Sequence, residues 1–107
     1  MTAASEEDAS AGVAHLDRII HEPARLVLIS NLAIVDEADF VFLSNRTGLT
    51  AGNISSHMAK LERTGYVHVA KSFVGRRPRT TYRITTSGRA AFDRYRKHVG
   101  GILDISP

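Results

Sequence analysis

The side chains best suited to specific chemistry lie in the run TAGNISSHMAK, residues 50–60, and that chemistry is hydrogen bonding. Ile54, Met58 and Leu61 have the i, i+4, i+7 spacing of a helix that buries one face. The step of about 100° per residue turns small and polar side chains to the other face. There, Asn53 can form two hydrogen bonds to adenine in a DNA major groove, and Gly52 lets the helix enter that groove.

Other polar residues of this predicted helix can also reach a duplex. Thr50, Ser55 and Ser56 carry hydroxyls for phosphates or base edges, and Lys60 lies further along, toward the phosphates. The candidate DNA contacts in this segment are Thr50, Gly52, Asn53, Ser55, Ser56, His57 and Lys60. The alternative is an ordinary amphipathic helix, but solvated faces more often carry Glu/Lys pairs than Gly-Asn-Ser-Ser.

Three arginines, Arg76, Arg77 and Arg79, form the second candidate site. They fall between predicted strands at 66–73 and 80–84, with Gly75 and Pro78 marking the tip of the hairpin. An arginine at such a tip can enter a narrow minor groove, where the negative potential is enhanced. The alternative is a solvated loop that prevents pairing at the edge of a sheet.

The sequence offers little for catalysis or metal binding. It contains no cysteine, which excludes disulfides and thiolate ligands, and no phosphate-binding loop or nucleophile elbow. His15, Asp17 and His21 lie close together, but no further ligand is nearby, so scattered surface histidines are the favoured interpretation. We therefore expect neither an enzyme, nor a metal site, nor a cofactor.

Charge is divided unequally along the 107 residues. Residues 1–45 contain two basic and eight acidic side chains, whereas residues 46–107 contain twelve basic and three acidic ones. A basic half joined to an apolar core is typical of a nucleic-acid-binding protein. No apolar run approaches the length of a membrane span, and the N-terminus lacks a signal peptide. These features predict a cytoplasmic, nucleoid-associated protein without a membrane partner.

The elements around both sites follow from periodicity. We expect a disordered tail at 1–11 and one domain at 12–107. Helices are predicted at 13–20, at 23–34 and, capped by Asp39, at 40–46, with a loop at 36–38 and room for a minimal strand near Ala38. Thr50 caps the polar-faced helix, Gly65 ends it, and Thr85 or Thr86 begins a final helix.

The first and last helices carry apolar stripes that one small core cannot easily cover. Pairing them across a two-fold axis would bury both, so we expect a homodimer. The residues assigned to this interface are Val13, Leu16, Ile20, Phe92, Tyr95, Val99 and Ile102.

The runs TGLTAGNISSHMAKLERTGYV and GRRPRTTYRITTSGRAAF together resemble compact single-domain winged-helix transcriptional regulators. The similarity is closest to the MarR family and more distant to ArsR and PadR regulators, and it covers residues 16–102. It implies an α+β winged helix-turn-helix fold and a homodimer that binds a pseudo-palindromic operator, usually as a repressor. It places Thr50, Gly52, Asn53, Ser56 and Lys60 in the DNA-reading helix, and Arg76, Arg77 and Arg79 in the wing.

One departure and one alternative accompany this resemblance. The last helix of such regulators often opens with Thr-Pro-Glu-Gly, whereas this chain has Thr85-Thr86-Ser87-Gly88. Loss of the acidic residue weakens that helix N-terminus. The alternative function is a protein-interaction module, because a winged helix does not by itself fix a function. No small-molecule effector is indicated.

Overall fold

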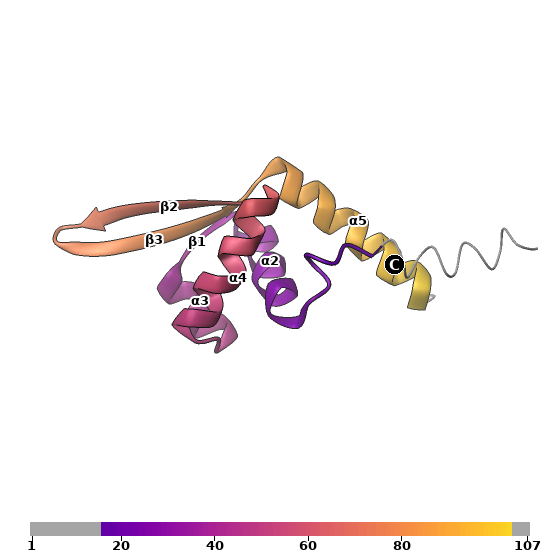
Figure 1. Cartoon of the computed structure of the whole chain (residues 1–107), viewed down its shortest axis with the longest axis horizontal. Helices are drawn as coiled ribbons and strands as arrows, with labels where there is room; N and C mark the ends of the chain where they lie inside the picture. The colour runs from indigo at the N-terminus through magenta and orange to yellow at the C-terminus, as the bar shows by residue number, and fades with distance from the viewer. Residues whose placement is uncertain (1–15, 104–107) are drawn as a thin grey trace, which may run out of the picture.

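The computed structural model describes residues 16–103, which form four α-helices and a three-stranded antiparallel sheet. The elements in chain order are α2 (Pro23–Val35), β1 (Glu37–Asp39), α3 (Phe40–Thr47), α4 (Ala51–Thr64), β2 (Val67–Val74), β3 (Arg77–Ile84) and α5 (Thr86–Leu103). Figure 1 shows α2, α3 and α4 gathered in one body, from which the β2–β3 hairpin and α5 project in opposite directions. The expected α+β winged helix-turn-helix fold is confirmed.

Side-chain caps fix where the helices begin. Glu22, Asp39 and Thr50 each accept a hydrogen bond from the backbone N–H three residues later, at 2.8, 2.8 and 3.2 Å. These bonds satisfy N–H groups that have no partner within the helix. Gly65, with φ of 88°, ends α4 in the left-handed conformation that glycine tolerates. The caps predicted at Asp39, Thr50 and Gly65 are confirmed.

One apolar core joins the helices to the base of the sheet. The predicted stripe of α4, Ile54, Met58 and Leu61, is fully buried, as are Leu28, Ile29 and Leu32 of α2. From the sheet come Val67, Tyr82 and Ile84, and from α5 come Ala91 and Tyr95. Because α4 packs against both α2 and β2, the core holds its opposite face toward solvent.

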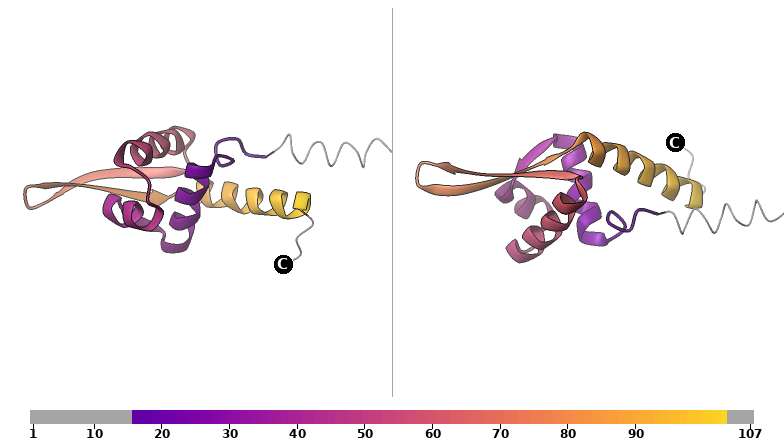
Figure 2. Two further views of the ribbon diagram at one scale, coloured as in Figure 1. Left: turned by 90° about the horizontal axis from the view of Figure 1, so that it is seen from below. Right: turned by 45° about the horizontal axis from the view of Figure 1, so that its top comes forward.

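The sheet has the strand order β1-β3-β2. The short β1 pairs with residues 81–83 of β3, while β2 pairs with β3 over its whole length, from Val67↔Ile84 to Val74↔Arg77. A two-residue turn, Gly75–Arg76, closes the hairpin, and Gly75 adopts a left-handed φ of 64°. Figure 2 shows the outer part of this wing extending beyond the helices.

Three sequence predictions about local structure are wrong. Residues 16–22 form turns rather than the end of a helix, because the Asp17 carboxylate accepts hydrogen bonds from the N–H groups of Ile19 and Ile20. Residues 37–39 form strand β1, so the loop expected at 36–38 is wrong and the minimal strand allowed near Ala38 is present. Pro78 and Arg79 belong to β3 rather than to the hairpin tip. Residues 1–15, including the predicted tail and Val13, lie outside the described part.

The start of α5 approaches the start of β2 closely. The Thr85 hydroxyl accepts a hydrogen bond from the Gly88 N–H at 2.9 Å and donates to the Gly65 carbonyl at 2.6 Å. Thr85 therefore caps this helix without an acidic residue. Gly88 is buried, and a Cβ built on it would overlap the backbone carbonyl of Tyr66. The contact between α5 and the chain before β2 therefore requires glycine.

Candidate nucleic-acid interface

The outer face of α4 is open to solvent along its N-terminal half. Among the residues predicted to contact DNA, those exposed here are Thr50, Gly52, Asn53, Ser55, Ser56 and Lys60. The Thr50 oxygen accepts the Asn53 N–H, so the Thr50 hydroxyl remains available as a donor. The amide of Asn53 is free to present both a donor and an acceptor to a partner. The structure thus brings these residues together on one accessible face.

Gly52 has no packing role among the residues that the structure describes. A Cβ built at this position meets nothing within 4 Å. Glycine inside a helix is less favourable than alanine by roughly 1 kcal/mol, so its presence here is unexplained by the fold. A surface that must approach the helix backbone closely would explain it.

His57 differs from the other candidates because it faces α2. Its Nδ1 lies 3.2 Å from an Nη atom of Arg25, and its Nε2 lies 3.8 Å from a carboxylate oxygen of Glu22. A guanidinium can only donate, so Nδ1 accepts and the ring proton sits on Nε2, toward Glu22. His57 therefore ties α4 to the start of α2. Arg25 and Glu22 were not among the sequence candidates.

Glu22 stays ionised in this cluster. The hydrogen bond from the Arg25 backbone N–H lowers the pKa of Glu22, and partial burial opposes the shift. The carboxylate therefore caps α2 and faces His57 at once. Its role is structural support behind the exposed face of α4.

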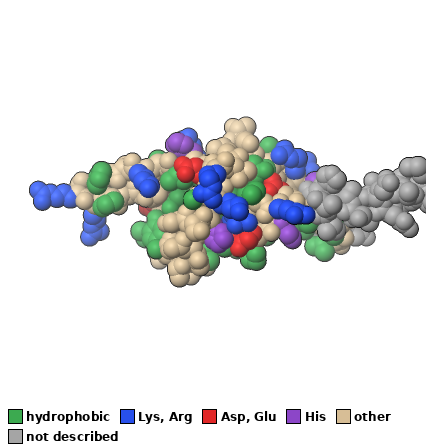
Figure 3. Space-filling model, in the orientation of Figure 1, with side chains coloured by type: hydrophobic (Ala, Val, Ile, Leu, Met, Phe, Trp, Pro, Cys, Tyr) green, Lys and Arg blue, Asp and Glu red, His purple; other side chains and the backbone are tan. Residues whose placement is uncertain are grey.

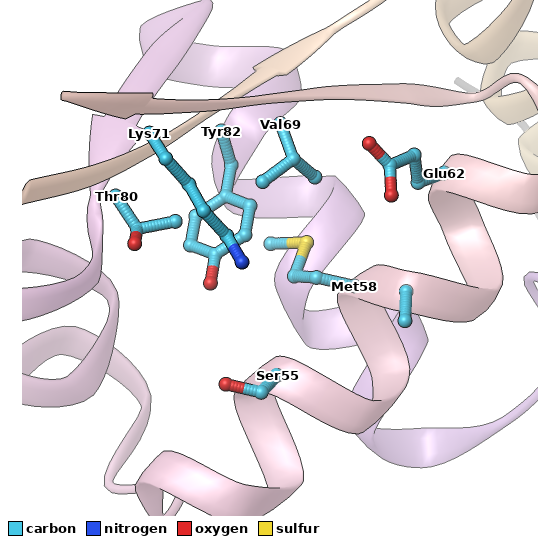
Figure 4. Close-up of a pocket in the computed structure, with 8 residues that line it drawn as sticks. Ser55, Met58, Glu62, Val69, Lys71, Thr80 and Tyr82 are labelled. Atoms are coloured by element: carbon cyan, nitrogen blue, oxygen red, sulfur yellow. The ribbon is translucent and has the colours of Figure 1, made fainter.

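A groove of about 210 Å³ separates α4 from the wing. Figure 4 shows the Ser55 hydroxyl on α4 and the Lys71 and Thr80 side chains on the wing pointing into it, with Tyr82 at its floor. Burial raises the pKa of Tyr82, so its hydroxyl stays protonated and can donate. Lys71 was not among the predicted site residues, and only its place in the strand register could have identified it.

The three wing arginines are all exposed, but they occupy different positions. Arg76 lies in the turn, and Arg77 and Arg79 lie on β3. Arg79 is 3.4 Å from the Asp39 carboxylate, whereas Arg76 and Arg77 form no ion pair within residues 16–103. Figure 3 shows basic side chains at the end of the hairpin and over the body. The tip thus carries uncompensated positive charge.

The residues predicted for dimerisation are divided between core and surface. Ile20 and Tyr95 are buried within the chain, and Leu16, Phe92 and Val99 are partly buried against the core. Ile102 and its neighbour Leu103 are exposed near the end of α5. Of the described residues assigned to the interface, Ile102 is therefore the one whose side chain is open to a partner.

Membrane spans and metal-binding clusters are both absent from residues 16–103. No helix within 16–103 is long and apolar enough to cross a membrane. Over the same range, no cluster of three or more His, Asp or Glu side chains is placed to hold a metal ion.

The chain is similar to known proteins in sequence and in fold. An uncharacterized protein of Methanocaldococcus jannaschii is 33% identical over 78 residues, which cover 73% of this chain and 85% of that protein. A transcriptional regulator homologue from Pyrococcus horikoshii OT3 has a TM-score of 0.81 and 30% identity, covering 92% of this chain and 95% of the other. NadR in complex with 4-hydroxyphenylacetate gives a TM-score of 0.68 at 20% identity, covering 96% and 72%, which shows a shared fold.

The family comparison agrees with the exposed polar helix and the basic wing. Residues 24–103 match the family described as the winged helix DNA-binding domain. This match confirms the resemblance to winged-helix regulators. Together with the regulator homologue, it indicates a DNA-binding protein rather than an enzyme. The chain belongs to the winged helix DNA-binding domain family.

Proposed function

We propose that this protein is a sequence-specific transcriptional regulator that binds a pseudo-palindromic operator as a homodimer and represses transcription in the cytoplasm, at the nucleoid. One observation carries the proposal: the exposed face of α4 with Gly52, Asn53 and Ser56 adjoins an open groove, into which Ser55 of α4 and Lys71 and Thr80 of the wing point. The similarity to a transcriptional regulator homologue supports the same role. Repression follows the usual behaviour of the regulators that the sequence resembles.

Within this proposal, the residues of α4 have separate tasks. Asn53 reads adenine in the major groove, with Gly52 allowing close approach and Ser56 reaching a neighbouring base or phosphate. Lys60 of α4 and Lys71 of the wing bind phosphates on either side, and so does the Thr50 hydroxyl. We assign His57 to positioning, because both of its ring nitrogens face partners on α2.

A protein-interaction module is the alternative function. Such a module is expected to present a contiguous apolar patch. The exposed face of α4 is instead polar from Asn53 to Lys60, and the adjoining wing is rich in arginine. A charged, small-residue surface of this kind fits a duplex better than a protein partner.

We expect Asn53→Ala to relax sequence preference while leaving general DNA affinity largely intact. Losing a two-hydrogen-bond contact to a base costs about 1–3 kcal/mol of discrimination. The measurement is titration of a duplex selected by the wild-type protein from a random library, beside a duplex of scrambled sequence. Asn45→Ala, an exposed asparagine on α3, is the matched control. Equal weakening on both duplexes would show that Asn53 does not read bases.

We expect the wild-type protein to be a dimer whose mass is twice the 11.7 kDa of the chain. Ile102→Glu places a charge on the exposed apolar end of α5 and is expected to give monomers by light scattering. Ala90→Glu makes the same charge change at an exposed position earlier in α5 and should remain dimeric. A wild-type monomer at micromolar concentration would rule out this arrangement.

The symmetry of the proposed dimer also predicts the symmetry and the half-site spacing of the operator. Two recognition helices related by a two-fold axis must meet one face of the duplex, with half-site centres roughly 34–36 Å apart. The selected duplexes should therefore contain an inverted repeat. A consensus without dyad symmetry would contradict the proposed dimer geometry while leaving DNA binding itself in place.

A further inference from the structure

The wing carries apolar side chains that no other residue within 16–103 covers. Phe73 and Val74, at the end of β2, are 72% and 60% exposed. They lie among Arg76, Arg77 and Arg79, beyond the part of the sheet that packs on the helices. In Figure 3, hydrophobic and basic side chains lie side by side on the projecting end of the hairpin. Folding does not explain a large aromatic side chain at this position.

The strand register shows which way Phe73 faces. It pairs with Pro78, and cross-strand partners share one face of a sheet. Faces alternate along the strands, so this pair lies on the same side as Val69–Tyr82 and Lys71–Thr80, which line the groove beside α4. Val74 and its partner Arg77 lie on the opposite side.

Three zones follow one another outward along this side of the wing. Nearest the core is the apolar base, with Tyr82 buried. Next comes a polar belt, in which Lys71 and Thr80 face Ser55 across the groove. Beyond it comes the exposed Phe73–Pro78 pair. If α4 occupies a major groove, the adjacent sugar–phosphate strand meets the polar belt, and the next surface outward is a minor groove.

We propose that Phe73, supported by Pro78, contacts the minor groove of the bound duplex as an apolar wedge. This inference rests on the proposed function and extends it. The surrounding arginines favour an anionic partner, and a minor groove supplies phosphates around an apolar floor of sugars and base edges. Phenylalanine and proline are among the residues that architectural proteins insert at base steps.

Such a wedge gives the protein a preference for easily deformed base steps, which hydrogen bonds to base edges do not provide. Pyrimidine–purine steps unstack more easily than other steps, so a wedge favours them in the flanks of the operator. The contact is apolar and releases no counterions. Its loss therefore lowers affinity without changing the salt dependence, in contrast to the loss of an arginine.

The test compares Phe73→Ala, Phe73→Leu and Val74→Ala on the selected duplex, with flanks that either contain or lack a TA step. Burial of a large apolar side chain corresponds to about a tenfold or greater change in affinity, so we expect Phe73→Ala to bind about tenfold more weakly. Its salt slope should equal that of the wild type, and its preference for the TA flank should disappear. Phe73→Leu should retain most of the affinity and most of the preference for the TA flank. Val74→Ala should bind like the wild type.

Other outcomes overturn the inference in distinguishable ways. Unchanged binding by Phe73→Ala, together with weakened binding by a variant lacking the wing arginines, rejects the wedge and keeps the proposed function. Unchanged binding by both variants rejects both. A Phe73→Ala protein that loses only binding to phosphatidylglycerol vesicles assigns the side chain to lipid, and one that changes only in mass assigns it to self-association. Unaltered melting temperatures exclude an effect through folding.

Discussion

Gly88→Ala is expected to destabilise the protein strongly, because Gly88, unlike Gly52 and Gly101, is a glycine at which an added Cβ would meet other atoms. The added Cβ would overlap the backbone carbonyl of Tyr66, which cannot move without shifting α5 away from β2. Overpacking typically costs about 1–3 kcal/mol, and a clash with backbone lies at or above the upper end of that range. For a domain of this size, a loss of about 3 kcal/mol lowers the melting temperature by more than about 10 °C. Thermal or denaturant unfolding of the Gly88→Ala variant and the wild type measures this loss of stability.

Gly101→Ala provides the matched control on the same helix. A Cβ at Gly101 meets nothing within 4 Å, and the residue is exposed. Alanine is favoured over glycine in a helix by roughly 1 kcal/mol, so this variant should be slightly more stable than the wild type. If the two variants behaved alike, the close approach at Gly88 would not be a constraint on the fold.

Replacing Arg76, Arg77 and Arg79 together with alanine is expected to give the largest loss of DNA binding. Each phosphate contact contributes about 0.9 to the slope of log affinity against log salt, so three losses reduce the slope by up to about 2.7. Hydrogen bonds to charged groups are worth about 1.5–3 kcal/mol each, so losing three of them predicts that affinity falls by more than about 1,000-fold on every duplex. The melting temperature should fall by a few degrees at most, because Arg76 and Arg77 form no ion pair within residues 16–103 and an exposed pair such as Arg79–Asp39 is worth about 0–1 kcal/mol.

A second triple variant shows whether the wing arginines act by touching DNA or only through the net charge of the protein. Arg94, Arg96 and Lys97 are exposed on α5, which projects away from the wing in Figure 1. Their replacement by alanine removes the same charge and should alter the salt slope much less. Equal effects of the two triple variants would indicate that the wing acts through the overall field of the protein rather than by touching DNA.

The sequence predicts best where a local rule decides the structure. The stripe Ile54, Met58 and Leu61, the cap at Thr50 and the left-handed Gly65 all depend on neighbours within one or two helical turns. Such features are set by spacing and side-chain type alone. The exposed face of α4 follows directly from them, so its candidate residues could be named in advance.

Predictions fail where partners are distant in sequence. The three residues of β1 form a strand because they pair with residues 81–83, some forty positions away. Pro78 fits within β3 although it has no N–H. Along an antiparallel pair of strands, hydrogen-bonded and non-hydrogen-bonded residue pairs alternate. The Phe73–Pro78 pair is the second from the turn and is of the kind that needs no N–H from Pro78. The contact of His57 with Arg25 and the place of Lys71 in the groove likewise need the assembled fold.

The outer half of the wing has a consequence for how relatives of this protein can diverge. Residues 71–79 are all exposed, so their side chains can be exchanged with little effect on the core. The length of the hairpin is equally free, but side chains alternate between its two sides. An insertion of one residue pair reverses the side on which every outer residue lies, whereas two pairs restore it. The reach of the wing can therefore evolve in steps of about 7 Å without disturbing its contact surface.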